Sequence, residues 1–331
     1  GYGRKWHAHK GHIIYDVEAA KRVLAGLVQQ AGAQIWYETL ASGVVMEGHR
    51  LAGLIVESKS GREAILARVV VDATGDADVA ARAGAPLHTR APRARHSFCF
   101  RLGRVDVDRF VQYLVDHPDE YPAYMDVDWT FAEALAQYRD TGTLLFPHGG
   151  AMQMEIFRRA RQAGEYPQRI GMHDTLDACQ MHAIRDLGVV HLVTGFVTLD
   201  DLDIGKISRA MDDGRKMAYA VTDFFQRRVP GFERATVIAT ADDLGIRVSR
   251  WLDGDFRFTR AMKENPTTFA DAIGRGVVER DIRKHPGPNA WGVQTFTIDF
   301  FHIPYRCLLP RRVDGLLMGA GRSVSSEGPW L

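Results

Sequence analysis

The sequence predicts an α/β fold with a parallel sheet, into which a second, α+β part is inserted. Three observations predict it. The segment 68–86, RVVVDATGDADVAARAGAP, leads an apolar strand into Gly75 and then at once into a small helix. The valines at 69–71 are consecutive and β-branched, which is typical of a parallel strand covered on both faces. An amphipathic helix and several short strands with glycine turns precede this segment.

The first of these elements is the helix that begins after Asp16. Apolar residues recur at helical spacing from Val17 to Ala31, with Asp16 as the expected N-cap and Gly32 as the residue that ends the helix. Strands are predicted at 33–37, 42–46, 51–58 and 63–75, and the turns between them contain Glu47-Gly48 and Ser60-Gly61. This order is a helix, a strand, a meander and a strand that ends at Asp72.

The helix after Gly75 is expected to be capped by Asp76 or Asp78 and to end at Gly84. Ligands of open α/β sheets bind at the carboxyl ends of strands, beside helix N-termini. Gly75 lacks a side chain at this point, so the sequence predicts that a ligand approaches the backbone here.

The middle of the chain, from about 97 to 301, has a mixed pattern of helices and strands. Helical stripes occur at 107–115, 131–138 and 152–163, and the longest runs over 204–229, from an Asp203 cap to Pro230-Gly231. Strands are predicted at 189–198 and 235–241.

The composition is that of an average globular protein. The 331 residues are 46% hydrophobic and 25% charged, with a net charge of +1, so we expect neither a nucleic-acid nor a membrane partner. No apolar run is long enough to span a bilayer, and we expect a cytoplasmic location. Cys99, Cys179 and Cys307 are far apart and form no C-x-x-C pair, which argues against an iron–sulfur cluster.

Four stretches carry a resemblance to a known family. They are YDVEAAKRVLAGLVQQAGAQIWYET, VVVDATGDADVAARAGAP, VPGFERATVIATADDLGIRVSRWLDGD and IPYRCLLPRRVDGLLMGAGRSVS, and they follow one another over most of the chain. Together they resemble FAD-dependent oxidoreductases related to heterodisulfide reductase A-like and fumarate reductase-type flavoproteins. The resemblance implies a partial FAD-binding Rossmann-like sheet of the glutathione reductase type with a β-meander. It divides the chain into an FAD-binding part at 1–96, a substrate or cap domain at 97–300 and a return to the FAD-binding domain at 301–331.

The resemblance also implies the cofactor, FAD, and the residues that bind it. These are Ala73, Thr74, Gly75, Asp76, Gly319, Gly321 and Arg322. The family opens with a strand, a G-x-G-x-x-G turn and a helix that holds the FAD pyrophosphate, and this sequence has no such turn. We therefore interpret the chain as apparently truncated at both ends. Charge-assisted hydrogen bonds are worth about 1.5–3 kcal/mol each, so we expect FAD to bind weakly or not at all, and the strand at 69–71 to lack a neighbour.

Two groups of side chains are the catalytic candidates. Arg247 and Arg250 are three residues apart, so a helical or turn geometry would point both into one pocket, where arginine can bind a carboxylate through two bonds. The alternative is a pair of surface ion-pair residues. His302, Tyr305 and Arg306 lie near Pro304 and Pro310 in a rigid segment, where the histidine could donate or accept a proton; the alternative is a structural histidine.

The N-terminal His7, His9 and His12 suggest a metal site, but no fourth ligand is evident and we expect no metal. The favoured function is hydride transfer between the flavin N5 and a small-molecule substrate, for which a carboxylate is the candidate class, with an electron partner of unspecified kind. The alternatives are a truncated non-catalytic segment without cofactor, and a carboxylate- or carbohydrate-binding module.

Overall fold

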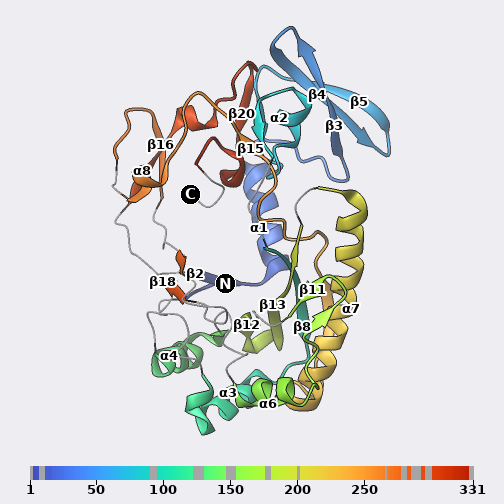
Figure 1. The fold of residues 1–331 in the computed structure, drawn as a ribbon, viewed down its shortest axis with the longest axis vertical. Coiled ribbons are helices and arrows are strands. Elements are labelled where there is room, and N and C mark those ends of the chain that lie inside the picture. Colours follow the sequence, from blue (N-terminus) through green and yellow to red (C-terminus); the bar gives the residue numbers. More distant parts are fainter. Residues whose placement is uncertain are drawn as a thin grey trace. The chain divides into compact units, whose positions relative to one another are not determined.

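The computed structural model describes residues 3–6, 12–89, 95–121, 130–146, 154–175, 180–199, 202–264, 267–276, 282–284, 292–294 and 300–327 (Figure 1). The chain forms two compact units. Unit 1 comprises Gly1–Gly32 and Arg95–Ile246, and unit 2 comprises Ala33–Ala94 and Arg247–Leu331. The mixture of helices with parallel and antiparallel strands confirms the predicted α/β class with an α+β part.

The limits of the two units differ from the predicted limits at 96 and 300. Residues up to Gly32 belong with unit 1 because Ile14 packs in its core and Glu18 pairs with Arg101 at 3.4 Å. Residues from Arg247 onward belong with unit 2 because Trp251 pairs with His88 across two short antiparallel strands.

A seven-stranded antiparallel sheet is the centre of unit 1. Its strands are β8 (Arg95–Gly103), β9 (Thr143–Phe146), β10 (Arg169–Ile170), β11 (His173–Asp174), β12 (Gln180–Ile184), β13 (Val189–Thr198) and β14 (Thr236–Thr240). β13 pairs with β8 along one edge and with β12 and β11 along the other. Its register shifts between Thr194 and Phe196, where Gly195 has a φ of +77°.

The helix α7 (Ile204–Arg228) packs along this sheet, as the predicted stripe at 204–229 requires (Figure 1). Asp203 Oδ1 accepts a hydrogen bond from Lys206 N at 2.8 Å and caps it. Ala218, Val221 and Phe225 are fully buried. Gly214 lies against the Phe98 ring of β8, and a Cβ at this position would lie 2.5 Å from Cδ2 of that ring.

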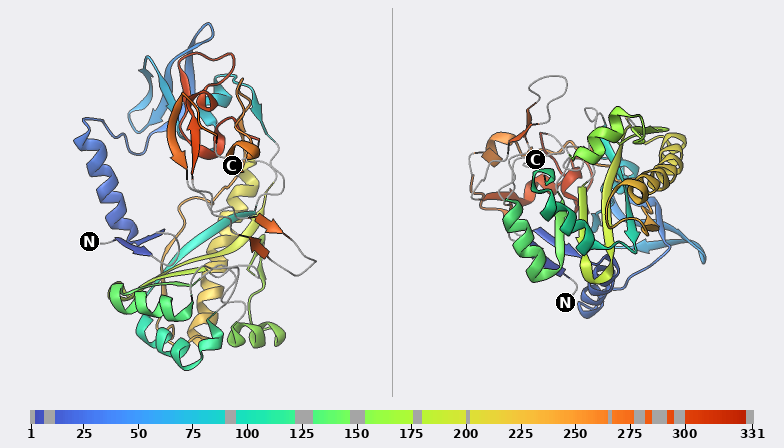
Figure 2. Two further views of the ribbon diagram at one scale, coloured as in Figure 1. Left: turned by 90° about the vertical axis from the view of Figure 1, so that its left-hand side faces the viewer. Right: turned by 90° about the horizontal axis from the view of Figure 1, so that it is seen from below.

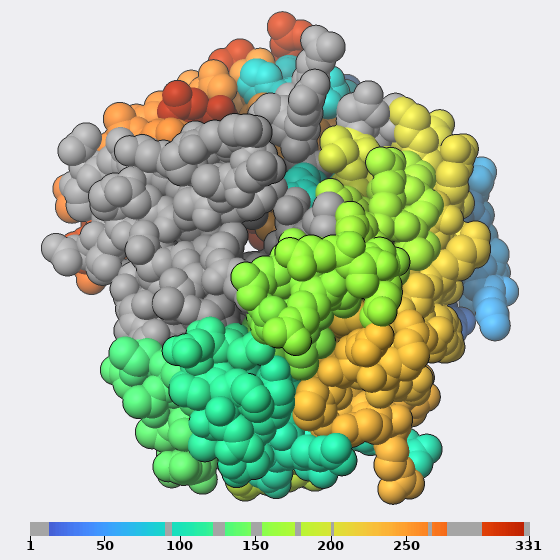
Figure 3. Space-filling model, turned by 60° about the horizontal axis from the view of Figure 1, so that its bottom comes forward, coloured from blue at the N-terminus to red at the C-terminus, as the bar shows by residue number. Residues whose placement is uncertain are grey.

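Shorter helices complete the core of unit 1. They are α3 (Val107–Asp116), α4 (Phe131–Thr141) and α6 (Glu155–Gln162), with 3₁₀ turns at Pro118–Glu120 and Arg185–Leu187. These helices confirm the predicted stripes at 107–115 and 131–138, and the described part of the stripe at 152–163. Phe157 of α6 meets Phe224 and Phe225 of α7 with ring centroids 5.1 and 5.4 Å apart. Residues of α6 and of the C-terminal half of α7 adjoin on the face shown in Figure 3.

The N-terminal segment of unit 1 is a hairpin followed by a helix. β1 (Gly3–Trp6) pairs with β2 (His12–Tyr15), and α1 (Val17–Gln30) follows the Asp16 N-cap, whose Oδ1 accepts from Ala19 N at 2.7 Å. Gly32, at φ +75°, follows its end, so both predicted limits of this helix are confirmed. In contrast to α7, α1 has no buried residue, and the left view of Figure 2 shows that beyond its first turn it stands apart from the sheet.

Unit 2 holds the predicted meander and the predicted parallel strand. The meander is β3 (Leu40–Glu47), β4 (Arg50–Ser58) and β5 (Gly61–Leu66), with turns at Gly48 and at Ser60 as expected. β6 (Val70–Asp72) pairs in parallel with β20 (Leu316–Met318), which joins two segments about 245 residues apart in the sequence. The helix α2 (Asp78–Arg82) follows β6, and Gly84, at φ +77°, follows its end.

The remaining elements of unit 2 are short. They are β7 (Leu87–His88), β15 (Trp251–Leu252), α8 (Arg260–Glu264), β16 (Ala272–Gly276), β17 (Ile282–Lys284), β18 (Gly292–Gln294), β19 (Phe301–Pro304) and the 3₁₀ turns η3 (Tyr305–Leu308) and η4 (Gly321–Ser323). Each of the two-stranded pairs β7–β15, β16–β19 and β17–β18 is antiparallel.

Three details of unit 2 correct the sequence-based expectations. The predicted strand at 33–37 is not a strand, because Trp36 and Tyr37 are exposed and no described segment pairs with them. The strand at 69–71 does have a neighbour, β20, so the expectation that it would lack one is wrong. It is nevertheless not covered on both faces by the described residues, since Val70 is 7% exposed whereas Val69 and Val71 are 54% and 57% exposed.

None of the helices in the described part of the chain combines the length and the apolarity that crossing a bilayer requires.

Candidate cofactor-binding site

The carboxylate of Asp72 fixes the loop after β6 through hydrogen bonds. This aspartate is fully buried, and its Oδ1 accepts hydrogen bonds from the backbone N and the hydroxyl of Thr74 at 3.0 and 2.6 Å. Its Oδ2 accepts from Ala80 N at 2.9 Å, and Thr74 Oγ1 accepts from Asp78 N at 2.9 Å. Asp72 and Thr74 therefore cap α2, and the expectation that Asp76 or Asp78 would cap it is wrong.

The reason for this correction is the backbone of residue 77. Ala77, the residue before α2, has a φ of +54°, and it makes no side-chain cap. The loop turns sharply here, so the orphan N–H groups of the helix face back toward the end of β6 rather than toward Asp76. Sequence reasoning missed Asp72 as a site residue. An aspartate followed by threonine two positions later, directly after an apolar strand, is the signal that could have found this turn.

Gly75 makes room for the side chain of Arg322. Gly75 has a φ of +85°, and a Cβ there would lie 2.8 Å from Cζ of Arg322. Arg322 Nε donates to Gly75 O at 2.7 Å, and Nη2 lies 3.3 Å from Asp76 Oδ2. The predicted residues Gly75, Asp76 and Arg322 are thus brought together, although 247 positions separate Arg322 from Gly75.

Asp76 and the backbone around it are held by a second cationic side chain. Arg250 Nε donates to Asp76 O at 2.8 Å, and its Nη2 forms an ion pair with Asp78 Oδ1. The Ser249 hydroxyl donates to Asp76 Oδ1. Ser249 is a further residue that sequence reasoning missed, and only the folded contact identifies it.

The loops after the two parallel strands lie at one edge, because parallel strands end at the same side of a sheet. Gly319 N donates to Asp72 O at 2.8 Å, which continues the ladder beyond β20. A Cβ on Gly319 would lie 2.7 Å from Val71 Cγ1, so this glycine allows a close strand contact. A Cβ on Gly321 would meet nothing within 4 Å. Ala73, Thr74, Gly319 and Gly321 are exposed, so this edge is accessible to a ligand.

The other catalytic candidates, His302, Tyr305 and Arg306, contact a different part of unit 2. His302 Nδ1 accepts from Phe269 N at 3.2 Å, and Tyr305 N donates to Asp271 O at 2.8 Å. The Arg306 backbone N donates to Asp271 Oδ2 at 3.2 Å, and its guanidinium lies 4.4 Å above the Phe256 ring. These three residues share the Phe269–Asp271 neighbourhood, and their described contacts do not include the loop after β6.

Neither Arg247 nor Arg250 is in a helix, so of the helical or turn geometry expected for this pair only the turn geometry stays a prediction. His7 and His9 lie outside the described residues, as does the side chain of His12. Among the described residues, no cluster of three or more His, Cys, Asp or Glu side chains could hold a metal ion. Cys307 is buried, its Sγ donates to Pro304 O at 2.9 Å, and burial raises the pKa of its thiol to about 11.

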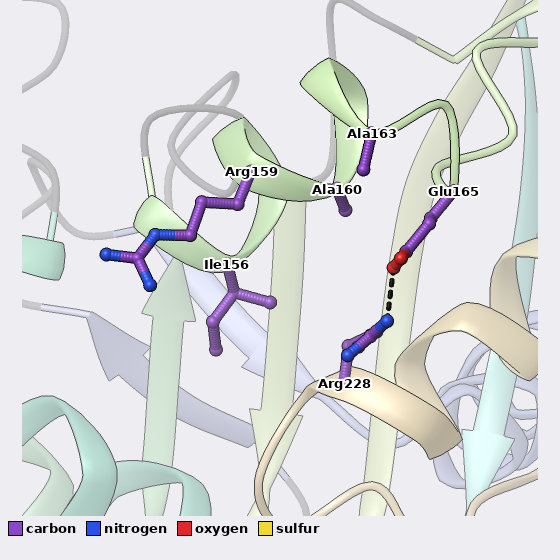
Figure 4. A pocket seen from close by; sticks show the side chains of 6 residues that line it. All are labelled: Ile156, Arg159, Ala160, Ala163, Glu165 and Arg228. Carbon is purple, nitrogen blue, oxygen red and sulfur yellow. Dashed lines mark hydrogen bonds and ion pairs between the residues drawn. The ribbon is translucent and has the colours of Figure 1, made fainter.

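A cavity of about 300 Å³ lies on unit 1 beside α6 (Figure 4). Glu165 and Arg228 form an ion pair across it, and Arg159 points away from that pair toward Glu155. The two charges at its wall therefore neutralise one another, and this cavity has no evident chemistry.

The fold is α/β, and the loops after its parallel strands β6 and β20 meet at the carboxyl edge, where open α/β sheets bind their ligands. A family model described as "FAD dependent oxidoreductase" matches residues 1–328. The chain belongs to this family, and FAD is its family's cofactor. Its predicted place among the heterodisulfide reductase A-like relatives stays a prediction.

The solved structures that are similar to the chain include the following three. A geranylgeranyl bacteriochlorophyll reductase-like protein from Thermoplasma acidophilum is 15% identical, with a TM-score of 0.37, over 72% of this chain and 43% of its own. The flavin-dependent brominase Bmp2 is 11% identical (TM-score 0.34; 70% and 46% covered), and the myxobacterial chondrochloren halogenase CndH is 14% identical (TM-score 0.36; 70% and 40% covered). The chain spans less than half the length of each. No curated protein sequence matches it.

Proposed function

We propose that the protein is an oxidoreductase that transfers a hydride between a small-molecule substrate and FAD, with the loops after β6 and β20 as its contacts with the cofactor. The family membership supports the redox class. The observation that carries the site is the pairing of Gly75 with Arg322, which ties the two loops together at the carboxyl edge of the parallel strands.

The residues present at this edge fit a nucleotide cofactor. Gly321 offers open space beside an exposed backbone, and Arg322 brings a cation to the same edge. The fully buried Asp72 fixes the loop, so the backbone of Ala73, Thr74 and Gly75 keeps its shape before a ligand arrives. We infer that Ala73, Thr74, Gly75, Asp76, Gly319, Gly321 and Arg322 hold FAD.

The flavin supplies the redox chemistry when it is bound. The residues of the chain bind and orient the flavin, and one of them carries a proton. Arg250 acts in this proposal as a positioning residue, since its guanidinium holds Asp76 O and Asp78. His302 accepts through Nδ1, which leaves Nε2 as the nitrogen that can carry and deliver a proton. Tyr305, Arg306 and Arg247 remain candidates for substrate contact. A carboxylate substrate and a cytoplasmic location belong to the same proposal.

The test is calorimetric titration of the chain with FAD. Because the sequence has no G-x-G-x-x-G turn, we expect a weak complex, with a Kd on the order of 0.1–1 mM. Gly321→Leu should weaken FAD binding by about 10-fold or more while leaving the urea unfolding midpoint unchanged, because the new side chain occupies open space at the cofactor edge.

Gly26→Leu is the matched control. A Cβ on Gly26 would also meet no atom within 4 Å, but this glycine lies in α1 of unit 1. The Gly26→Leu variant should bind FAD as the wild type does. Absence of FAD binding by the wild type at about 1 mM would favour the alternative of a segment without cofactor. Unchanged FAD binding by Gly321→Leu would show that the cofactor does not use this edge.

A further inference from the structure

A second cavity in unit 1, of about 400 Å³, lies on the sheet face opposite the one that α7 covers. Burial alternates along β12 and β13: Val190 and Leu192 are buried in the core, whereas Val189 and His191 face the other way. The end of β2 and the start of α1 form the opposite wall. We call this cavity the sheet pocket.

One row of side chains crosses four neighbouring strands at the floor of the sheet pocket. Leu145 of β9 is opposite His182 of β12, His182 is opposite His191 of β13, and His191 is opposite Arg101 of β8. All four residues line the cavity. Directly opposed residues of an antiparallel sheet share a face, so this row presents an apolar end and a cationic end to one ligand.

The cationic end is equipped to take an anion. The Nδ1 atom of His191 is buried, and it has no hydrogen-bond partner among the residues that the structure describes. The His182 and His191 rings are stacked with centroids 5.9 Å apart. A buried polar atom without a partner costs free energy, and a ligand that bonds to His191 would remove this cost.

Arg101 beside it already binds a carboxylate, although a weakly held one. Its Nη2 lies 3.4 Å from Glu18 Oε1, and the Glu18 side chain is 61% exposed. Exposed ion pairs contribute little to stability, so a ligand carboxylate can replace Glu18 on the inner side of the guanidinium. The Arg101 side chain is itself only 20% exposed, which favours its interaction with a ligand inside the cavity.

Most of the other lining residues are apolar; the exceptions are Tyr15 and Asp16, and Asp16 Oδ1 accepts a hydrogen bond from Ala19 N at 2.7 Å as the cap of α1. Ile184 and Val189 lie on the same sheet face beyond the histidines, and Ile14 from β2 is buried in the core next to the cavity. The volume matches that of sites for small organic molecules. The pocket therefore combines a cationic end with a mostly apolar wall that includes one carboxylate, Asp16.

We propose that the sheet pocket binds a small organic acid, with its carboxylate on Arg101 and His191 and its apolar body against Leu145, Ile184 and Val189. This site goes beyond the proposed flavin function and does not rest on it, since all of its residues belong to unit 1 and the proposed cofactor contacts belong to unit 2.

The test uses benzoate as the probe and the full chain without added FAD. Calorimetry should detect benzoate binding below about 10 mM, and the neutral isostere benzamide should bind about 10-fold more weakly or worse. Arg101→Gln should weaken benzoate binding by about 10-fold or more, as expected when a charge-assisted bond is lost. Arg109→Gln removes an exposed arginine that pairs with Glu233 at 3.0 Å in the same unit, and it should leave benzoate binding unchanged.

A second measurement covers the case in which Arg101→Gln does not fold. The imidazole proton resonance that is missing from the spectrum of His191→Leu identifies His191 among the 13 histidines. Benzoate should shift this resonance in the wild-type protein, and benzamide should not. No benzoate binding at about 10 mM, equal binding of benzamide, or an unmoved His191 resonance would each overturn the proposal. Because FAD is absent, a negative result leaves the flavin proposal to its own titration.

Discussion

The helices α7 and α1 are both amphipathic in sequence, and both begin at an aspartate cap, but they differ in what covers them. In α7 the residues Met217, Val221 and Phe225 are fully buried against the sheet. In α1 the corresponding stripe, with Leu24 62% and Leu27 56% exposed, has no buried member. The periodicity of apolar residues specifies a helix and its inner face, but it does not specify the surface that the face meets.

The largest expected difference comes from removing a large side chain of each stripe. Phe225→Ala should lower the free energy of unfolding by about 3–5 kcal/mol, because Phe225 is fully buried and its ring lies 4.9 Å from that of Phe232 and 5.4 Å from that of Phe157. Leu24→Ala should change it by less than about 0.5 kcal/mol. Urea unfolding followed by circular dichroism measures both.

A loss of about 2 kcal/mol or more in Leu24→Ala would contradict this expectation. It would mean that the stripe of α1 is covered in solution. An equally small effect of Phe225→Ala would show instead that the packing of α7 on the sheet is wrong.

Glycines inside the two helices give a finer comparison. Gly26→Ala in α1 should stabilise the protein by about 0.5–1 kcal/mol, since nothing lies within 4 Å of the new Cβ and alanine favours the helix. Gly214→Ala in α7 should destabilise it by about 1–3 kcal/mol, because the new Cβ would lie 2.5 Å from the Phe98 ring. A higher melting temperature of Gly214→Ala would contradict the close approach of α7 to β8, and a lower one of Gly26→Ala would contradict the open surroundings of Gly26.

The smallest expected effect is a pH dependence of the unfolding stability, caused by His191 where the start of α1 borders the sheet. Burial, and then the nearby Arg101, lower the pKa of His191 from its ordinary value near 6.5. The unfolded chain therefore binds a proton at this residue more readily than the folded chain does. The stability contributed by neutral His191 is complete above pH 6.5 and is lost as the pH falls toward the lowered pKa.

His191→Leu isolates this contribution, because Arg101, His182, Asp16 and Glu18 around the sheet pocket stay in place. The urea midpoint of the wild type should fall more than that of His191→Leu between about pH 7.5 and 5.5. Parallel pH profiles would refute the lowered pKa.

Local chemistry made much of the fold predictable. The caps at Asp16 and Asp203 and the turns at Gly48 and Ser60 require only neighbouring residues, and all are confirmed. The parallel pairing of β6 with β20 was not predicted, since the strand at 69–71 was expected to lack a neighbour and no local pattern links residues so far apart. The strand expected at 33–37 failed because a strand needs a partner, which propensity does not supply.

The candidate site divides in the same way. Gly75 was predictable because a strand that runs into a helix needs a turn, and its φ of +85° shows why glycine stands there. The roles of Asp72, Ser249 and Arg250 depend on contacts across the fold, and the sequence offered only the residue types. The row from Leu145 to Arg101 could not be predicted from the sequence, because its members come from four separate strands that only the fold brings together.

The guanidinium of Arg322 occupies the space that a side chain at position 75 would need. A residue with a side chain at 75 would have to displace this guanidinium and adopt the left-handed φ of +85°, and a shorter side chain at 322 would remove the first of these two costs. Among homologous sequences we expect the two sites to change together, and an arginine at the second site to accompany glycine at the first. Such covariation would be a record of this contact that is independent of any coordinates.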